Sequence, residues 1–121
     1  MARILVAEDD VAVRDFVERG LKALGHGVTA VANGGDAFAL LQQDSDYSLL
    51  LTDIVMPVMD GIALALKVAD SWPDLPILMM TGFSHERQRA HNLDALITEV
   101  IEKPFTLDQL DKAVKRALQA A

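Results

Sequence analysis

The sequence predicts an α/β protein with a doubly wound, five-stranded parallel sheet that carries helices on both faces. Short apolar runs alternate five times with segments whose apolar residues recur at three- and four-residue spacing. That alternation is typical of strands followed by amphipathic helices, which pack as a parallel sheet with right-handed crossovers. Several of the apolar runs end in an acid, a hydroxyl or an amine. The chemistry is therefore expected at the carboxyl ends of the strands.

Five strands are expected at the apolar runs. The first, third and fourth runs are almost continuously apolar, which is typical of central strands buried on both faces. The second and fifth runs are shorter or more polar, and we place them at the edges of the sheet. The expected spatial order is therefore 2-1-3-4-5. The five expected strands are residues 3–7, 27–31, 49–53, 77–81 and 99–102.

Five helices are expected between and after these strands. Gly25 is the stop signal of the first helix, and Pro73 follows the end of the third. The last helix opens with a capping box formed by Thr106 and Gln109. The fourth segment is polar and has the weakest apolar stripe. The expected helical segments are residues 13–24, 36–43, 60–71, 84–93 and 106–118.

Length and composition indicate one cytoplasmic domain spanning residues 1–121. The chain is 51% hydrophobic, which is enough for a proper core, and it contains no cysteine. The formal net charge of -7 argues against nucleic acid or an anionic membrane as a partner. No apolar run approaches the length of about 18 residues that a membrane helix requires, and no secretory leader opens the sequence.

Acidic groups at neighbouring strand ends predict a metal site. Glu8 and Asp9 follow the first strand, and Asp53 closes the third. Carboxylates held this close repel one another and require a cation. Oxygen ligands without cysteine or clustered histidine select a hard ion such as Mg²⁺.

The same edge can support phosphoryl chemistry. An ionised Asp53 is a possible nucleophile that forms an aspartyl-phosphate. Thr81 and Lys103, which follow the fourth and fifth strands, can supply a hydroxyl donor and a fixed positive charge. Each feature alone has a structural explanation, and for Asp10 the capping of the first helix is the better one. Their joint occurrence at four strand ends favours chemistry.

With these residues, the chain resembles the receiver domains of two-component response regulators, which have a flavodoxin-like fold. The resemblance covers residues 3 to about 119 and consists of five motifs in the expected order. These motifs are Glu8-Asp9, Asp53 with Met56-Pro57 and Asp60-Gly61, Thr81, and Lys103-Pro104-Phe105.

The resemblance implies that Asp53 accepts a phosphoryl group from a histidine kinase or a phosphotransfer protein. It also implies that Asp9, Asp53 and the backbone carbonyl of Val55 hold Mg²⁺, with Glu8 acting through a coordinated water. The expected protein is a switch rather than an enzyme, because it catalyses only its own phosphorylation and slow dephosphorylation. Its output is then a change in a protein-binding surface.

For Thr81 and Lys103 the resemblance implies contacts with the phosphoryl oxygens, and for the Lys103–Pro104 bond it implies the cis isomer. The chain departs from many relatives in two ways, which affect how the switch signals and how long the phosphoryl group persists. Val100 stands where relatives often carry an aromatic switch residue, so movement of residues 82–84 is expected instead. Val55 and Phe83 are apolar where many relatives have polar groups that position the hydrolytic water. A long-lived phosphoryl group is therefore expected.

Three further expectations concern partners and alternatives. The chain resembles, more weakly, stand-alone receivers of alphaproteobacterial cell-cycle circuits, which points to protease machinery as one downstream partner. A monomer or a phosphorylation-dependent dimer is expected. The alternatives are a pseudo-receiver binding module and a Mg²⁺-dependent aspartyl phosphohydrolase, although the latter class places an Asp-x-Asp motif after its first strand, where this chain has Glu8-Asp9-Asp10.

Overall fold

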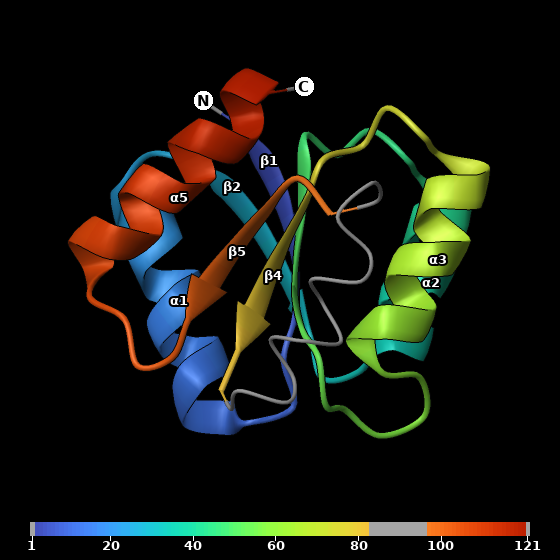
Figure 1. Cartoon of the computed structure of the whole chain (residues 1–121), viewed down its shortest axis with the longest axis horizontal. Helices are drawn as coiled ribbons and strands as arrows, with labels where there is room; N and C mark the ends of the chain where they lie inside the picture. The colour runs from blue at the N-terminus through green and yellow to red at the C-terminus, as the bar shows by residue number, and fades with distance from the viewer. Residues whose placement is uncertain (1, 83–96, 121) are drawn as a thin grey trace.

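The computed structural model describes residues 2–82 and 97–120 and contains one sheet of five parallel strands (Figure 1). The strands lie in the order β2-β1-β3-β4-β5, as predicted. The almost continuously apolar strands are the central three, because both of their faces are covered. The strands are β1 (Arg3–Ala7), β2 (Gly27–Val31), β3 (Leu49–Asp53), β4 (Ile77–Thr81) and β5 (Glu99–Glu102).

Four helices are described, two on each face of the sheet. Figure 1 shows α1 and α5 on one face and α2 and α3 on the other. The fourth expected helix, over residues 84–93, lies outside the described residues. No helix in residues 2–82 and 97–120 has the length and apolarity needed to cross a membrane. The helices are α1 (Val11–Ala23), α2 (Gly34–Gln43), α3 (Gly61–Ser71) and α5 (Leu107–Ala120).

Alternate residues of each central strand build two separate apolar layers. Side chains of successive strand residues point to opposite faces, so Leu50 joins the α2–α3 layer and Leu51 the α1–α5 layer. All five residues of β3 and all five of β4 are buried. The strand ends are therefore held by packing on both sides, and the groups that follow them start from fixed positions.

Side-chain caps set where the helices begin. Asp10 Oδ1 accepts hydrogen bonds from the N–H groups of Ala12 and Val13, which confirms its expected role as the cap of α1. The predicted capping box of α5 is present, with Thr106 and Gln109 exchanging both hydrogen bonds. The second helix begins two residues earlier than expected, at Gly34, because Asn33 caps it.

Three apolar residues at the expected helical spacing are exposed. Phe16 of α1 is 42% exposed, Leu24 at the end of α1 is 37% exposed, and Leu107 of α5 is 38% exposed. The ring of Phe16 lies 6.2 Å from that of Phe105, between ring centroids, so the two aromatic residues cover the rim between α1 and the segment before α5. Helical spacing alone does not distinguish this rim from the core.

A second aromatic pair lies between α2 and the end of α3. The rings of Phe38 and Trp72 are 5.5 Å apart between centroids, and Lys67 Nζ lies 5.5 Å from the centroid of the Phe38 ring. Trp72 caps the C-terminus of α3 through its backbone N–H. The pair stabilises the α2–α3 layer, and Trp72 itself lies toward the end of the sheet at which β4 begins.

Replacing Gly61 with Ala is expected to destabilise the protein by about 1–3 kcal/mol, because the new Cβ would overlap the carbonyl oxygen of Asp53. The Gly61 N–H also donates to Ile54 O at 2.7 Å, so backbone movement would break that bond. Urea unfolding measures the loss.

The matched control is Gly27→Ala on the edge strand, where the nearest atom to a new Cβ is 3.9 Å away. Its change in unfolding free energy should stay within about 0.5 kcal/mol. Equal losses for both variants would contradict the close approach at Gly61.

Candidate functional site

Three carboxylates meet at the carboxyl ends of β1 and β3. Glu8 and Asp9 directly follow β1, and Asp53 is the last residue of β3, which pairs with β1. One carboxylate oxygen from each lies within 4.8 Å of the others. Glu8 and Asp53 are buried whereas Asp9 is exposed, so the cluster opens to solvent on the Asp9 side. Parallel pairing thus gathers residues that are 45 positions apart in the sequence.

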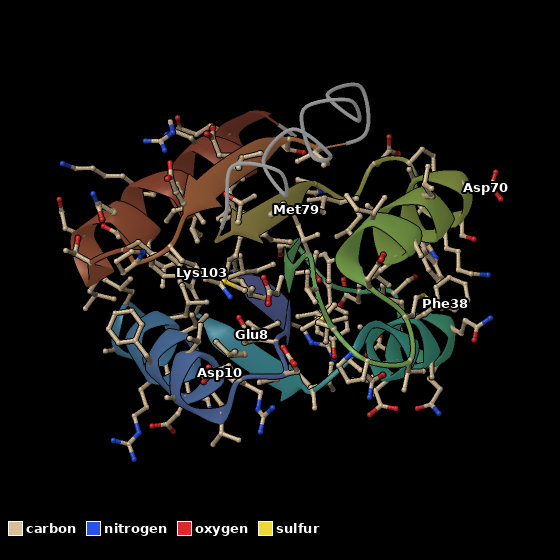
Figure 2. All side chains as sticks on the ribbon, turned by 60° about the horizontal axis from the view of Figure 1, so that its bottom comes forward. Glu8, Asp10, Phe38, Asp70, Met79 and Lys103 are labelled. Atoms are coloured by element: carbon tan, nitrogen blue, oxygen red, sulfur yellow. The ribbon has the colours of Figure 1, made fainter. Side chains whose placement is uncertain are left out.

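Lys103 joins this cluster from the edge strand. It follows β5, and its Nζ lies 2.8 Å from Glu8 Oε1 and 3.1 Å from Asp53 Oδ1. Figure 2, turned toward this end of the sheet, shows Lys103 and Glu8 together near the centre of the molecule. The Lys103–Pro104 peptide bond is cis, as the resemblance implies.

Each polar group of Glu8 has a hydrogen-bond or ion-pair partner. Its Oε2 accepts from the N–H of Asp10 at 3.0 Å, and its own N–H donates to Val31 O at 3.0 Å. Its carbonyl accepts from Arg14 Nη1 at 2.9 Å. The sequence pattern does not predict the Arg14 contact, because the only signal is a cation on the first turns of the helix after an acid.

Asp53 is held on one oxygen only. Its Oδ1 accepts from the Ile54 N–H at 2.9 Å and also faces Lys103. Its Oδ2 receives no hydrogen bond or ion pair from the described part of the chain. The Asp53 backbone is fixed as well, since Thr52 Oγ1 donates to its carbonyl at 2.9 Å.

Thr81 and Val55 complete the set of expected site residues. Thr81 is buried, and within residues 2–82 and 97–120 its Oγ1 is the one buried side-chain polar atom without a hydrogen-bond partner. An unpaired buried hydroxyl is costly and usually has a functional reason. Val55 lies two residues after Asp53, in the loop before α3, with a side chain that is 56% exposed.

Charge is unbalanced at this site. Burial raises the pKa of Glu8 to about 7, although hydrogen bonds from Lys103 and the Asp10 N–H oppose the rise. Burial also lowers the pKa of Lys103, but the hydrogen bond to Glu8 and the charge of Asp53 outweigh it and the net shift is upward. Lys103 therefore remains charged.

The oxygen donors of this site fit Mg²⁺. Three carboxylates face a single ammonium group, so the cluster keeps an excess of negative charge when they ionise. The donor set consists of oxygen atoms, and Asp9 is open to solvent, as an ion that retains several waters requires. A divalent cation would favour the charged form of Glu8 and so oppose the rise in its pKa that burial causes.

The fold and the site together define a doubly wound α/β protein whose chemistry lies where the central strands end. Residues 4–115 match the family model described as the response regulator receiver domain. The chain therefore belongs to the response regulator receiver domain family, and it is a phosphoacceptor signalling switch of two-component systems.

Individual relatives agree with this assignment. The chain is 42% identical over 121 residues to the response regulator receiver protein CpdR of Brucella abortus, covering all of both chains. It is 35% identical to the response regulator MprA of Mycolicibacterium vanbaalenii, of which it covers 46%.

Solved structures show the same fold. The receiver domain of NtrX from Brucella abortus is 29% identical, with a TM-score of 0.89 over 98% of this chain and 99% of that one. The chemotaxis response regulator CheY4 of Vibrio cholerae is 28% identical, with a TM-score of 0.85 over 97% and 98% of the two chains.

Replacing Glu8 with Gln should change how stability depends on pH in metal-free buffer. The folded-state pKa of Glu8 lies above its usual value, so the folded protein binds the extra proton between about pH 4.5 and pH 7. Its contribution to stability is thus present at low pH and lost as pH rises through this window. Relative to the native chain, Glu8→Gln should gain about 2–3 kcal/mol between pH 5 and pH 8.

Urea unfolding in EDTA at pH 5, 6, 7 and 8 measures this difference, and subtraction removes groups that titrate equally in both proteins. A difference that is independent of pH would contradict the raised pKa of Glu8.

Proposed function

We propose that Asp53 is the phosphoacceptor of this switch and that a histidine kinase or a phosphotransfer protein is its donor. The observation that carries the proposal is the meeting of three carboxylates within 4.8 Å, with Lys103 Nζ 3.1 Å from Asp53. Of the three, Asp53 closes the central strand β3, and it has one carboxylate oxygen free of described contacts.

We assign the Mg²⁺ ligands to Asp9, Asp53 and the carbonyl of Val55, with Glu8 acting through water. Glu8 suits the indirect role because both of its carboxylate oxygens already accept hydrogen bonds. When bound, Mg²⁺ supplies charge neutralisation for the phosphoryl oxygens and fixes their orientation.

Asp53 Oδ2 is the proposed nucleophile. It attacks phosphorus and forms the new O–P bond, while the bond from phosphorus to the donor nitrogen breaks and its electron pair stays with the donor imidazole. Oδ1 remains held by the Ile54 N–H, so the carboxylate keeps its orientation during attack. Positioning of this kind is most of what phosphoryl transfer needs from a protein.

Lys103 and Thr81 would then respond to the new charge. Lys103 Nζ, already 3.1 Å from Asp53, can pair with a phosphoryl oxygen and so release Glu8. The hydroxyl of Thr81, which has no partner among the described residues, can donate to another oxygen. Val100 occupies the position of the usual aromatic switch residue, and the output expected from residues 82–84 stays a prediction, because residues 83 and 84 lie outside the described part of the chain.

The proposed switch also has a compartment, a limited catalysis of its own and a downstream partner. We take residues 1–121 as one receiver domain that acts in the cytoplasm, where nucleotide-dependent kinases supply phosphoryl groups. Its own catalysis is limited to self-phosphorylation and slow self-dephosphorylation. A downstream protein, with protease machinery as one candidate, would read the altered surface of a monomer or of a phosphorylation-dependent dimer.

Incubation with acetyl phosphate and Mg²⁺ should add one phosphoryl group to the native chain, as measured by intact-protein mass. Asp53→Asn should remain unmodified, because the amide cannot replace the carboxylate as a nucleophile. Removal of Mg²⁺ with EDTA should also abolish the adduct.

Lys103→Arg is the matched variant that keeps a positive charge and changes its geometry. It should still accept the phosphoryl group. If the native chain gives no adduct and beryllofluoride fails to bind, the pseudo-receiver is the better description. Continuous release of phosphate from many monoesters would instead indicate the phosphohydrolase.

Replacing Val55 with Asn should shorten the lifetime of phosphorylated Asp53. An amide at this position can hydrogen-bond the attacking water, and one such bond is worth about 1 kcal/mol, or about a fivefold rate increase. Decay of the phosphorylated mass after removal of acetyl phosphate gives the half-life.

Leu66→Asn serves as the control, since Leu66 lies on α3, outside this loop, with a side chain that is 48% exposed. A native half-life of seconds, or equal acceleration by both variants, would refute the role given to Val55.

A further inference from the structure

Residues 31–35, which run from the end of β2 into the first turn of α2, contact both of the segments that carry the acidic cluster. The carbonyl of Val31 accepts from the N–H of Glu8 at 3.0 Å. Three residues later, the N–H of Gly34 donates to the carbonyl of Met59 at 3.1 Å. One short segment thus links the turn after β1 to the loop between β3 and α3.

The Gly34 contact requires glycine at that position. Gly34 is the first residue of α2, so its N–H has no partner within the helix and is available to the loop. Asn33 uses its side chain to cap the N–H of Asp36 instead. A Cβ at Gly34 would overlap the carbonyl oxygen of Met59. The helix and the loop approach each other backbone to backbone.

The next glycine lies under Val58. A Cβ at Gly35 would come within 2.8 Å of Val58 Cγ1 and 3.2 Å of Asn33 Oδ1. Val58 has a φ of 69°, a left-handed conformation that β-branched residues rarely adopt, and its side chain is 85% exposed. Burial of that side chain does not impose this conformation, so the backbone contacts on either side of it must.

The loop is thereby fixed at both ends. Near Asp53, the N–H of Gly61 donates to the Ile54 carbonyl at 2.7 Å, and near α2 the Met59 carbonyl is held by Gly34. Asp53 and Val55 lie in or beside this fixed segment, while Glu8 and Asp9 lie in the segment held by Val31. Pairing of β1 with β3 places Asp53 relative to Glu8 and Asp9. The loop after Asp53, which carries the Val55 carbonyl, is instead placed by its contacts with residues 34 and 35.

We propose that residues 31–35 are a positioning element for the divalent cation, in which Gly34 and Gly35 hold the β3–α3 loop at the distance that Mg²⁺ coordination requires. The inference rests on the proposed function, since it concerns the same metal site. Groups that orient metal ligands from behind commonly change affinity by about 10–100-fold when they are lost.

The test measures the affinity for Mg²⁺ by isothermal titration calorimetry. The proteins compared are the native chain, Gly35→Ala, Val58→Ala and the double variant. Gly35→Ala should weaken Mg²⁺ binding by about tenfold, because its Cβ pushes Val58 and the loop away from α2. Val58→Ala removes Cγ1, so the double variant should return to within about twofold of the native affinity. Gly27→Ala on the adjacent strand should bind as the native chain does.

Each outcome has a separate meaning. A native chain that binds Mg²⁺ while Gly35→Ala binds it equally well overturns this inference and leaves the proposed function intact. Equal weakening in Gly35→Ala and in the double variant, with both folded by circular dichroism, also overturns it. A native chain that binds no Mg²⁺ overturns both proposals.

A second measurement needs no variant. In nuclear magnetic resonance titrations of the native protein, the amide signal of Gly34 should shift with Mg²⁺ and saturate with it, although Gly34 carries no ligand. The amide of Gly25, at the turn after α1, should remain unchanged. A Gly34 signal that stays still through saturation would refute the positioning role.

Discussion

The arrangement of this protein depends on the pairing of one ammonium group with two buried carboxylates. Lys103 contacts Glu8 and Asp53 across sequence separations of 95 and 50 residues, so it links the end of β5 to the ends of β1 and β3. A buried carboxylate without such a partner would carry a large desolvation cost. Within residues 2–82 and 97–120, the third carboxylate, Asp9, has no ion pair of its own. The described carboxylates of the site therefore outnumber its ammonium group by three to one.

Packed strands hold the groups of the site in place. The carboxyl ends of β1, β3 and β4 are fixed by two apolar layers that meet only through the sheet. Thr81 is the last residue of β4 and Lys103 directly follows β5, so both lie at strand ends rather than in long loops. Sites built on strands hold their geometry more tightly than sites built on loops. A small change of charge can therefore be converted into a defined change of surface.

The sequence predicted all five strands, their order and the gathering of the acidic cluster, because continuous apolar runs and parallel topology leave few alternatives. It also predicted the caps at Asp10 and Thr106, which have local signatures. It did not predict the Arg14 contact to the Glu8 carbonyl or the approach of Gly34 to Met59. Contacts between a side chain or backbone N–H and a distant carbonyl follow no periodicity. The exposed positions of Phe16, Leu24 and Leu107 were missed for a related reason, since helical spacing identifies a face but not where the covering layer ends.

The aromatic pair of Phe38 and Trp72 has a practical consequence. Trp72 is the single tryptophan of the chain, and it packs between α2 and α3 at the end of the sheet away from the acidic cluster. Its fluorescence should therefore report global unfolding and remain nearly silent to events at Asp53. Optical melting curves and signalling chemistry can then be followed in one sample without interfering with each other.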